Sequence, residues 1–306
     1  MTEISVIIPF YNRIDWLLCA IKSVQEQTFA DFEIIIIDDG STDDMACLFK
    51  LKDDRIRYFK QENKGPAAAR NLGIEKSKGN YIAFLDSDDV FLPQKLEAQF
   101  RFFNENKDVS MVHTSYKRIS ENMEVMETIN SGIFSKNVYP QILSSCPIAT
   151  PTVMVKRQVL NSLRFPEDIK IGEDVVLWIQ IAKDNKVYGI DIPLSLVRMR
   201  DNSTSITPAS QLEGNINILN FVMKFDSTLT QKYKIKRISE IYTSVAYLYY
   251  QNKDKKNCRK YIAKAWITNP SIPSLFIFTR LLAMILIPQK YHAKIKKILL
   301  YFRKRL

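Results

Sequence analysis

The chain has 306 residues, 46% of them hydrophobic and 25% charged, a composition that excludes an intrinsically disordered protein and allows one catalytic domain with an appendage. The net charge of +11 is unevenly spread, because residues 206–306 hold 19 lysines and arginines against 4 acidic residues, whereas residues 1–205 hold 25 against 29. The four cysteines lie far apart, which argues against a zinc knuckle and against a CxxC redox site.

The first ninety residues alternate between strand-like and helix-like segments. Short apolar runs, typical of strands buried on both faces of a parallel sheet, predict strands at residues 4–8, 33–37, 56–59 and 81–85. Helical spacing of apolar residues over 14–24, and a start at Gly65-Pro66 with an end near Gly79, predict the helices between them. This alternation predicts an α/β fold with a doubly wound, mostly parallel sheet flanked by helices.

Beyond residue 90 the pattern is less regular. It predicts helices at 96–103 and 174–182, and strands at 109–113, 152–155, 186–189 and 194–199. From about residue 207 onward only helices are predicted, including 238–250 and 256–266. We therefore expect an α/β domain over residues 1–205 and a basic helical region over residues 206–306.

The loop Asp86-Ser87-Asp88-Asp89 follows the fourth predicted strand. Three carboxylates in four residues repel one another, so a positive group is expected beside them. Oxygen ligands suit Mg²⁺ or Mn²⁺, which proteins usually bind through one or two carboxylates together with substrate phosphates. The alternative is a solvated acidic turn that caps the helix after it.

Two further acidic segments precede predicted helices. Asp38-Asp39-Gly40 follows the second strand, and Glu173-Asp174 follows Gly172. Each has a plainer explanation, because acidic residues favour turns and the amino ends of helices. The carboxyl ends of neighbouring parallel strands meet at one edge of a sheet, so the loops at Asp39 and Asp88 are expected to face one crevice.

Four segments, in this order and at this spacing, resemble family 2 glycosyltransferases of the GT-A fold, of the bacterial surface-polysaccharide type. They are SVIIPFYNR, EIIIIDDGSTDD, NKGPAAARNLGIEKSKGNYIAFLDSDD and GEDVVLW. The resemblance covers residue 4 to about residue 205 and includes the closing segment 197–205. It implies a nucleotide-sugar-binding catalytic domain at 1–205 that moves a sugar from a UDP-sugar to an acceptor hydroxyl, as a metal-dependent, inverting, hexosyltransferase-type enzyme.

The resemblance also implies which residues bind the nucleotide. Pro9, Tyr11 and Asn12 match the residues that line the nucleotide pocket of this family. Asp39 matches the aspartate that contacts the uracil base. Arg70 matches an arginine that lies near the base or the diphosphate.

For the reacting groups, the resemblance places Asp86 on the ribose and Asp88 on the metal, Mn²⁺ or Mg²⁺, which holds the donor diphosphate. Glu173 and Asp174 match the family's late acidic motif, in which the aspartate is the general base on the acceptor. Trp178 matches an aromatic residue that borders the acceptor site, and a core tryptophan on an amphipathic helix is the alternative.

Other enzyme classes fit the residues less well. A dinucleotide-binding oxidoreductase would carry GxGxxG after the first strand, where residues 9–13 hold no glycine. A nucleotidyltransferase would carry a glycine-rich basic loop there, which is also absent. The alternative from another class is a non-catalytic membrane-surface protein that binds carbohydrate or nucleotide on a transferase-like domain.

Residues 280–306 mix basic with bulky apolar side chains, as helices lying in a membrane interface do. A nucleic-acid partner would call for stacking aromatics and fewer aliphatics, so we expect none. A helical cap on the catalytic domain is the alternative. The apolar stretch 272–287 is too short to span a bilayer, and the N-terminus lacks the pattern of a signal peptide. We expect a cytoplasmic protein, peripheral on the inner face of the cytoplasmic membrane, with a lipid-linked saccharide acceptor.

Overall fold

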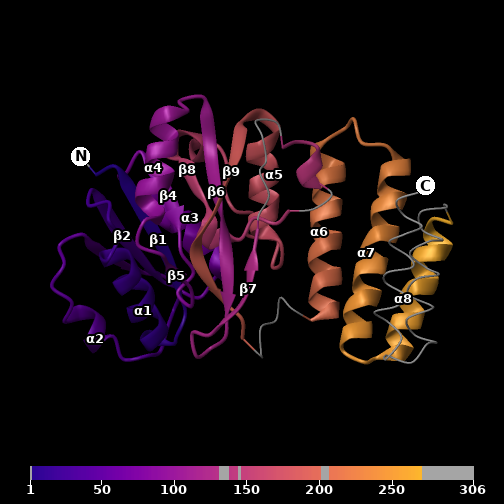
Figure 1. Ribbon diagram of the computed structural model, residues 1–306, viewed down its shortest axis with the longest axis horizontal. Helices are drawn as coiled ribbons and strands as arrows, with labels where there is room; N and C mark the ends of the chain where they lie inside the picture. The colour runs from indigo at the N-terminus through magenta and orange to yellow at the C-terminus, as the bar shows by residue number, and fades with distance from the viewer. Residues whose placement is uncertain (1, 131–137, 144–145, 201–206, 271–306) are drawn as a thin grey trace. The chain divides into compact units, whose positions relative to one another are not determined.

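The computed structural model describes residues 2–130, 138–143, 146–200 and 207–270. The chain divides into two compact units, Met1–Asn202 and Ser203–Leu306. In Figure 1 the first unit contains both strands and helices, and residues 207–270 of the second unit form helices. The candidate site residues all belong to the first unit.

Half of the sheet in the first unit is parallel. Its strands, in the order in which they pair, are β3 (Ile56–Lys60), β2 (Phe32–Asp38), β1 (Ile4–Phe10) and β4 (Tyr81–Phe84). Helix α1 (Ile14–Gln25) connects β1 to β2, short helix α2 (Ala46–Phe49) precedes β3, and α3 (Pro66–Lys76) precedes β4. All seven residues of β1 and of β2 are buried, as expected for strands covered on both faces. The predicted α/β alternation of this region is confirmed.

The other half of the sheet is mixed. Its strands are β5 (Val90–Phe91), β6 (Val109–Ile119), β7 (Val125–Ile129), β8 (Met154–Lys156) and β9 (Lys186–Arg198). Strand β8 lies antiparallel between β4 and β6, and β6 pairs in parallel with β9. Antiparallel pairs therefore form a larger share of the sheet than expected.

The strands predicted at 186–189 and 194–199 are one strand, β9. Its pairing with β6 shifts register around Ser115, where Ile190 and Pro193 are the successive partners of Thr114 and Ser115. Proline cannot donate to the ladder, and such a residue is commonly placed at a bulge. The irregularity interrupts the sequence pattern without ending the strand.

Helices cover both faces of the sheet. On one face, Val6 and Ile8 of β1 pack in a single core with Leu17 of α1 and Leu96 of α4 (Lys95–Glu105). On the other face lie α3 and α5 (Glu173–Asp184), where Phe84 of β4 contacts Phe165 and Trp178. Short 3₁₀ turns lie at Gln141–Leu143, Thr150–Thr152 and Arg157–Asn161. Because both faces are filled, the carboxyl edge of the parallel strands is the place left for a ligand.

Helix α3 approaches β1 closely. A Cβ atom at Gly73 would lie 2.3 Å from Cγ2 of Ile7, so only glycine allows this distance between the helix and the strand. Pro66 occupies the first turn of α3, and Gly65 precedes it with φ of 90°. These residues set the position of α3 on the sheet.

Over residues 207–270, the second unit contains three helices, α6 (Pro208–Phe225), α7 (Gln231–Gln251) and α8 (Lys255–Thr268). Thr207, Thr230 and Asp254 cap them by accepting backbone N–H groups. The helices predicted at 238–250 and 256–266 lie within α7 and α8. No helix in the part of the chain that the structure describes could span a bilayer. The predicted interfacial segment 280–306 lies outside the described residues.

Candidate active site

The loops after β1 and β2 are tied to each other. The Asn12 N–H donates to the Ser41 hydroxyl (2.8 Å), and the Thr42 N–H donates to Asn12 Oδ1 (2.9 Å). Asn12 has a φ of 58°, in the left-handed region, which asparagine tolerates better than most residues. Pro9 is buried in β1, whereas Tyr11 is 54% exposed beside the loop. The residues expected to line the nucleotide pocket are thus gathered where β1 ends.

Asp39 lies at the end of β2 and is almost completely buried. Its Oδ1 accepts hydrogen bonds from Gln61 Nε2 (2.7 Å) and the Lys64 N–H (2.8 Å), and its Oδ2 accepts one from the Gly65 N–H (2.8 Å). This carboxylate therefore holds the loop that leads into α3.

The three aspartates after β4 have different partners. Asp86 Oδ1 accepts from Arg70 Nη2 (2.6 Å), and Asp88 Oδ2 pairs with Arg200 Nε (3.1 Å). Asp89 Oδ1 accepts from the Arg198 N–H (2.8 Å). The expected positive groups are thus supplied in part by arginines of this chain.

Burial and mutual repulsion change the proton affinity of two of these acids. Burial, followed by the nearby charge of Asp86, raises the pKa of Asp88, although Arg200 opposes the rise. Burial and the charges of Asp88 and Asp86 raise the pKa of Asp89 well above its ordinary value. Additional positive charge beside Asp88 would therefore be favourable.

Asp88 is the aspartate of this loop that the family resemblance assigns to a cation. No group of three or more His, Cys, Asp or Glu side chains in the described ranges is arranged as a metal site. A single oxygen donor from the protein fits Mg²⁺ or Mn²⁺ when the ion takes its other ligands from a diphosphate and water. The raised pKa of the Asp88 carboxyl fits this role, since a cation would relieve its repulsion with Asp86.

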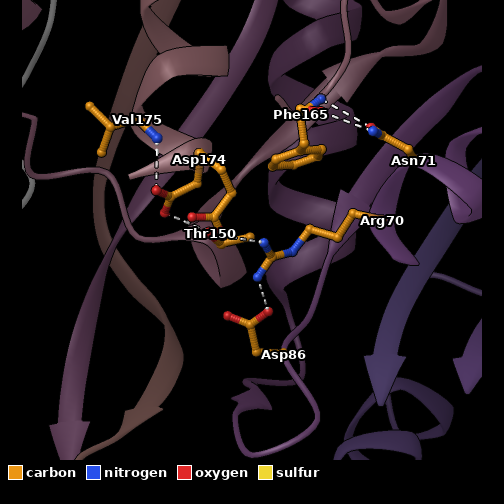
Figure 2. Close-up of polar contacts among 8 residues, drawn as sticks. Arg70, Asn71, Asp86, Thr150, Phe165, Asp174 and Val175 are labelled. Carbon is orange, nitrogen blue, oxygen red and sulfur yellow. Dashed lines mark hydrogen bonds and ion pairs between the residues drawn. The ribbon is translucent and has the colours of Figure 1, made fainter. Parts of the chain in front are cut away.

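Helix α5 brings the late acidic pair to the same edge. Glu173 Oε1 accepts from Arg70 Nη1 (3.1 Å). Asp174 Oδ2 accepts from the Thr150 hydroxyl (2.9 Å), and its Oδ1 accepts from the Val175 N–H (2.7 Å), as Figure 2 shows. Burial and the charge of Asp174 raise the pKa of Glu173, while Arg70 opposes the rise.

Arg70 joins segments that are distant in sequence. Its guanidinium lies between Asp86 and the start of α5, with the ring of Phe165 5.3 Å away (Figure 2). The family resemblance implies a position of Arg70 near the base or the diphosphate. Its two terminal nitrogens contact Asp86 and Glu173.

Trp178, expected to border the acceptor site, is completely buried. Its ring lies 6.0 Å from that of Phe84 and 5.7 Å from that of Phe165. This position matches the alternative of a core tryptophan on an amphipathic helix.

Three residues at the site were not singled out from the sequence. Thr150 orients Asp174, Arg198 binds the backbone oxygen of Asp88 through Nε (2.8 Å), and Arg200 pairs with the Asp88 carboxylate. The two arginines lie in the closing segment quoted for the family resemblance, which was the available signal. Nothing in the sequence around Thr150 marks it.

Comparison with known sequences adds three findings. The sequence model described as Glycosyl transferase family 2 matches residues 5–164. An uncharacterized glycosyltransferase of Rickettsia bellii is 52% identical over 224 residues, which is 72% of this chain but 32% of that protein. The Escherichia coli protein WfgD, named UDP-Glc:alpha-D-GlcNAc-diphosphoundecaprenol beta-1,3-glucosyltransferase, is 34% identical over 206 residues, or 67% of this chain and 79% of that protein.

The chain spans less than half the length of the Rickettsia relatives that head these matches, between 32% and 43%. Among solved structures, residues 1–349 of S. aureus TarS in complex with UDP-GlcNAc superpose with a TM-score of 0.58 at 19% identity, covering 85% of this chain and 90% of TarS 1–349. That likeness confirms the GT-A fold expected from the sequence.

Proposed function

Because the chain belongs to glycosyl transferase family 2, we propose that it transfers a sugar from a UDP-sugar to a saccharide hydroxyl, with inversion at the anomeric carbon. The observation that carries the proposal is the ion-pair bridge at Arg70. It brings the loop of Asp86 to the acidic pair at the start of α5, at the carboxyl edge where such sheets bind ligands. A donor and an acceptor can therefore be handled within one site.

On the donor side, Pro9, Tyr11, Asn12 and Asp39 would hold the nucleotide. A carboxylate has about four lone-pair positions, and three of those on Asp39 are used by the loop before α3. One remains on Oδ2 for an N–H group such as that of uracil. UDP is also named in the complexes of TarS and in the donor of WfgD, which supports a uridine diphosphate sugar here.

At the diphosphate, Asp86 would contact the ribose and Asp88 would hold Mn²⁺ or Mg²⁺. When bound, the ion would stabilise the negative charge that grows on the leaving diphosphate. Arg200, which pairs with Asp88, would offer its guanidinium to phosphate oxygens. The chain would thus place positive charge on the side from which the leaving group departs.

On the acceptor side, Asp174 would take the proton from the attacking hydroxyl. Thr150 and the Val175 N–H fix its carboxylate without using every lone pair, so an oxygen stays available as a proton acceptor. Attack from the face opposite the diphosphate exchanges one bond at the anomeric carbon for another with inverted configuration.

The proposed acceptor is a lipid-linked saccharide of bacterial surface-polysaccharide assembly, an O-antigen or a capsule. The name of WfgD specifies an acceptor on diphosphoundecaprenol, and the basic composition of residues 206–306 suits an anionic membrane surface. The protein would then act from the cytoplasm, at the inner face of the membrane.

A donor panel tests this function. Purified protein is incubated with UDP-glucose, UDP-galactose and their N-acetylated amines, each with a GlcNAc-diphospho-lipid, with Mn²⁺ or with EDTA. We expect release of UDP together with a lengthened lipid product for at least one donor, and loss of both in EDTA. Binding of UDP without turnover of any donor would favour the non-catalytic alternative.

A further inference from the structure

Arg70 has contacts that donor binding by itself does not explain. Its side chain is 7% exposed, and its terminal nitrogens reach Asp86 and Glu173, which are 16 and 103 residues away in sequence. Its Nε is buried and has no hydrogen-bond partner among the described residues. A guanidinium placed between two carboxylates can connect the segments that carry them.

The charge balance requires this arginine. Burial by itself would lower the pKa of Arg70, but Asp86 and Glu173, and also Asp174, raise it above its ordinary value. The guanidinium therefore remains charged. Removing it would leave Asp86 and Glu173, which are both partly buried, without their shared counter-ion, and this is unfavourable for the two carboxylates.

The start of α5 depends on few other contacts. Gly172 occupies the N-cap position with φ of 90°, and no side chain caps the helix there. A glycine N-cap has no side chain to accept the first N–H groups and leaves its backbone more freedom, so the Val175 N–H donates instead to Asp174 within the same turn. Among the described residues, two side-chain hydrogen bonds tie this turn to other segments, Arg70 to Glu173 and Thr150 to Asp174.

We propose that Arg70 is a positioning residue, which acts through Glu173 to hold the first turn of α5 so that Asp174 faces the reacting hydroxyl. Arg70 thereby ties the donor loop at Asp86 to the acceptor base. The inference rests on the proposed transferase function for its effect on catalysis. Its structural part, the fixing of the first turn of α5, can be observed without any substrate.

The test compares Arg70→Met, Glu173→Gln and the double variant. We expect kcat for transfer to fall about 10²-fold in Arg70→Met, the scale of a misplaced reacting group, while the Kd for UDP stays within about threefold. Because both residues act through one contact, the double variant should lose little more than Arg70→Met does. Arg70→Lys keeps the charge but replaces the two fixed terminal nitrogens, one for each carboxylate, with a single one on a flexible stem, so it should recover stability more than kcat.

Arg57→Met is the matched control. Arg57 pairs with Glu33 at 2.6 Å, toward the amino ends of β3 and β2, away from the candidate site. This variant should lose stability and keep kcat. It separates the general effect of losing an ion pair from the specific effect of losing the contacts of Arg70.

Hydrogen exchange gives the readout that needs no substrate. The amide of Val176, bonded to the Gly172 carbonyl, should lose protection in Arg70→Met and in Glu173→Gln but not in Arg57→Met. Unchanged protection would overturn the proposal, as would a rise of more than about tenfold in the Kd for UDP in Arg70→Met, the scale of a lost donor contact. If the exchange behaves as expected while the wild-type protein transfers no sugar, the proposed function fails and the fixing of α5 by Arg70 stands.

Discussion

At the scale of single residues, the acids at the carboxyl edge of the sheet differ in the partners that bind their carboxylates. Asp39 is bound to the backbone of the loop before α3, Asp86 to a buried arginine, and Asp88 to an arginine that is about one-third exposed. Within the described ranges, Asp174 accepts hydrogen bonds from a hydroxyl and an N–H group and has no arginine partner of its own. Asp88 and Asp174 are held less tightly than Asp39 and Asp86. They are the two acids proposed to bind the cation and to accept the proton of the acceptor hydroxyl.

Two substitutions separate those two roles. Asp88→Asn removes the negative charge proposed to hold the cation, so the stimulation of turnover by Mn²⁺ should disappear. Asp174→Asn cannot accept the hydroxyl proton, so transfer should fall by about 10² to 10⁴, while the Kd for UDP stays near the wild-type value. Calorimetry with UDP and Mn²⁺, together with initial rates, checks both. Transfer at near wild-type rates by Asp174→Asn would assign the base to another residue.

Lys95 gives a prediction about stability. It is completely buried in α4, 4.2 Å from the centre of the Phe91 ring, and no carboxylate pairs with it among the described residues. Its Nζ donates to Gln99. Burial lowers the pKa of Lys95 from 10.5 to about 7. Between these values the unfolded chain binds a proton that the folded chain does not, so this residue makes stability rise with pH from about 7 to 10.5.

Lys95→Met removes that dependence. The variant should gain most stability relative to the wild type at pH 7 and below, and the gain should shrink by up to about 1.4 kcal/mol per pH unit above pH 7. Gln99 loses a partner, which offsets the gain by about 1 kcal/mol at every pH. Urea unfolding at pH 6.5, 8 and 9.5 measures the difference. A gain that is independent of pH would show that Lys95 is charged throughout.

At the scale of secondary structure, the sequence predicts the parallel strands better than the mixed half of the sheet. Strands β1 and β2 are continuous apolar runs, which leave little ambiguity. Strand β5 has two residues, and four of the five in β7 are exposed, so neither has an apolar pattern to detect. The carboxyl-edge rule predicted where the acidic loops gather, whereas the contact between Arg70 and Glu173, made across 103 residues, depends on tertiary packing.

The distance between α3 and β1 is an element-scale feature with a testable effect. Gly73→Ala would place a methyl group 2.3 Å from Ile7 Cγ2, so α3 must move away from the sheet. Overpacking should cost about 1–3 kcal/mol despite the better helix propensity of alanine. Arg70 lies one turn earlier in α3, so kcat should fall as well. Glu75→Ala, on the exposed side of α3, is the control and should change neither. Wild-type stability of Gly73→Ala would contradict this account.

At the scale of the whole molecule, the two units differ in charge as well as in structure. Residues 206–306 carry the net positive charge, with 19 lysines and arginines against 4 acidic residues. The helices described there have apolar contacts of their own, such as Leu219 with Ile241 and Ala246 with Cys258. This unit therefore contains a small core in addition to its basic surface. Catalysis can therefore be tested by substitutions in residues 1–205, and attachment to a membrane surface by changes in residues 206–306.

Deletion of residues 280–306 tests attachment. The full chain should sediment with vesicles that contain phosphatidylglycerol, because basic and apolar side chains together favour an anionic interface, and the deletion variant should stay in the supernatant. Vesicles of phosphatidylcholine alone, and 0.5 M salt as roughly the level that screens surface charge, are the controls. Sedimentation of the deletion variant with anionic vesicles would place the attachment elsewhere.

The register irregularity in β9 has a consequence for changes in chain length. Side chains alternate between the two faces of a strand, so an insertion of one residue between Leu194 and Arg198 would turn Arg198 to the opposite face and away from Asp88 and Asp89. Around Asp191 and Ile192, where the ladder is already interrupted, an extra residue can be absorbed without that reversal. Natural or engineered variants of this protein that differ in length within β9 should therefore carry the inserted or deleted residue near Asp191 and Ile192. Variants that gain or lose a residue between that point and Arg198 should lose this arginine from the site.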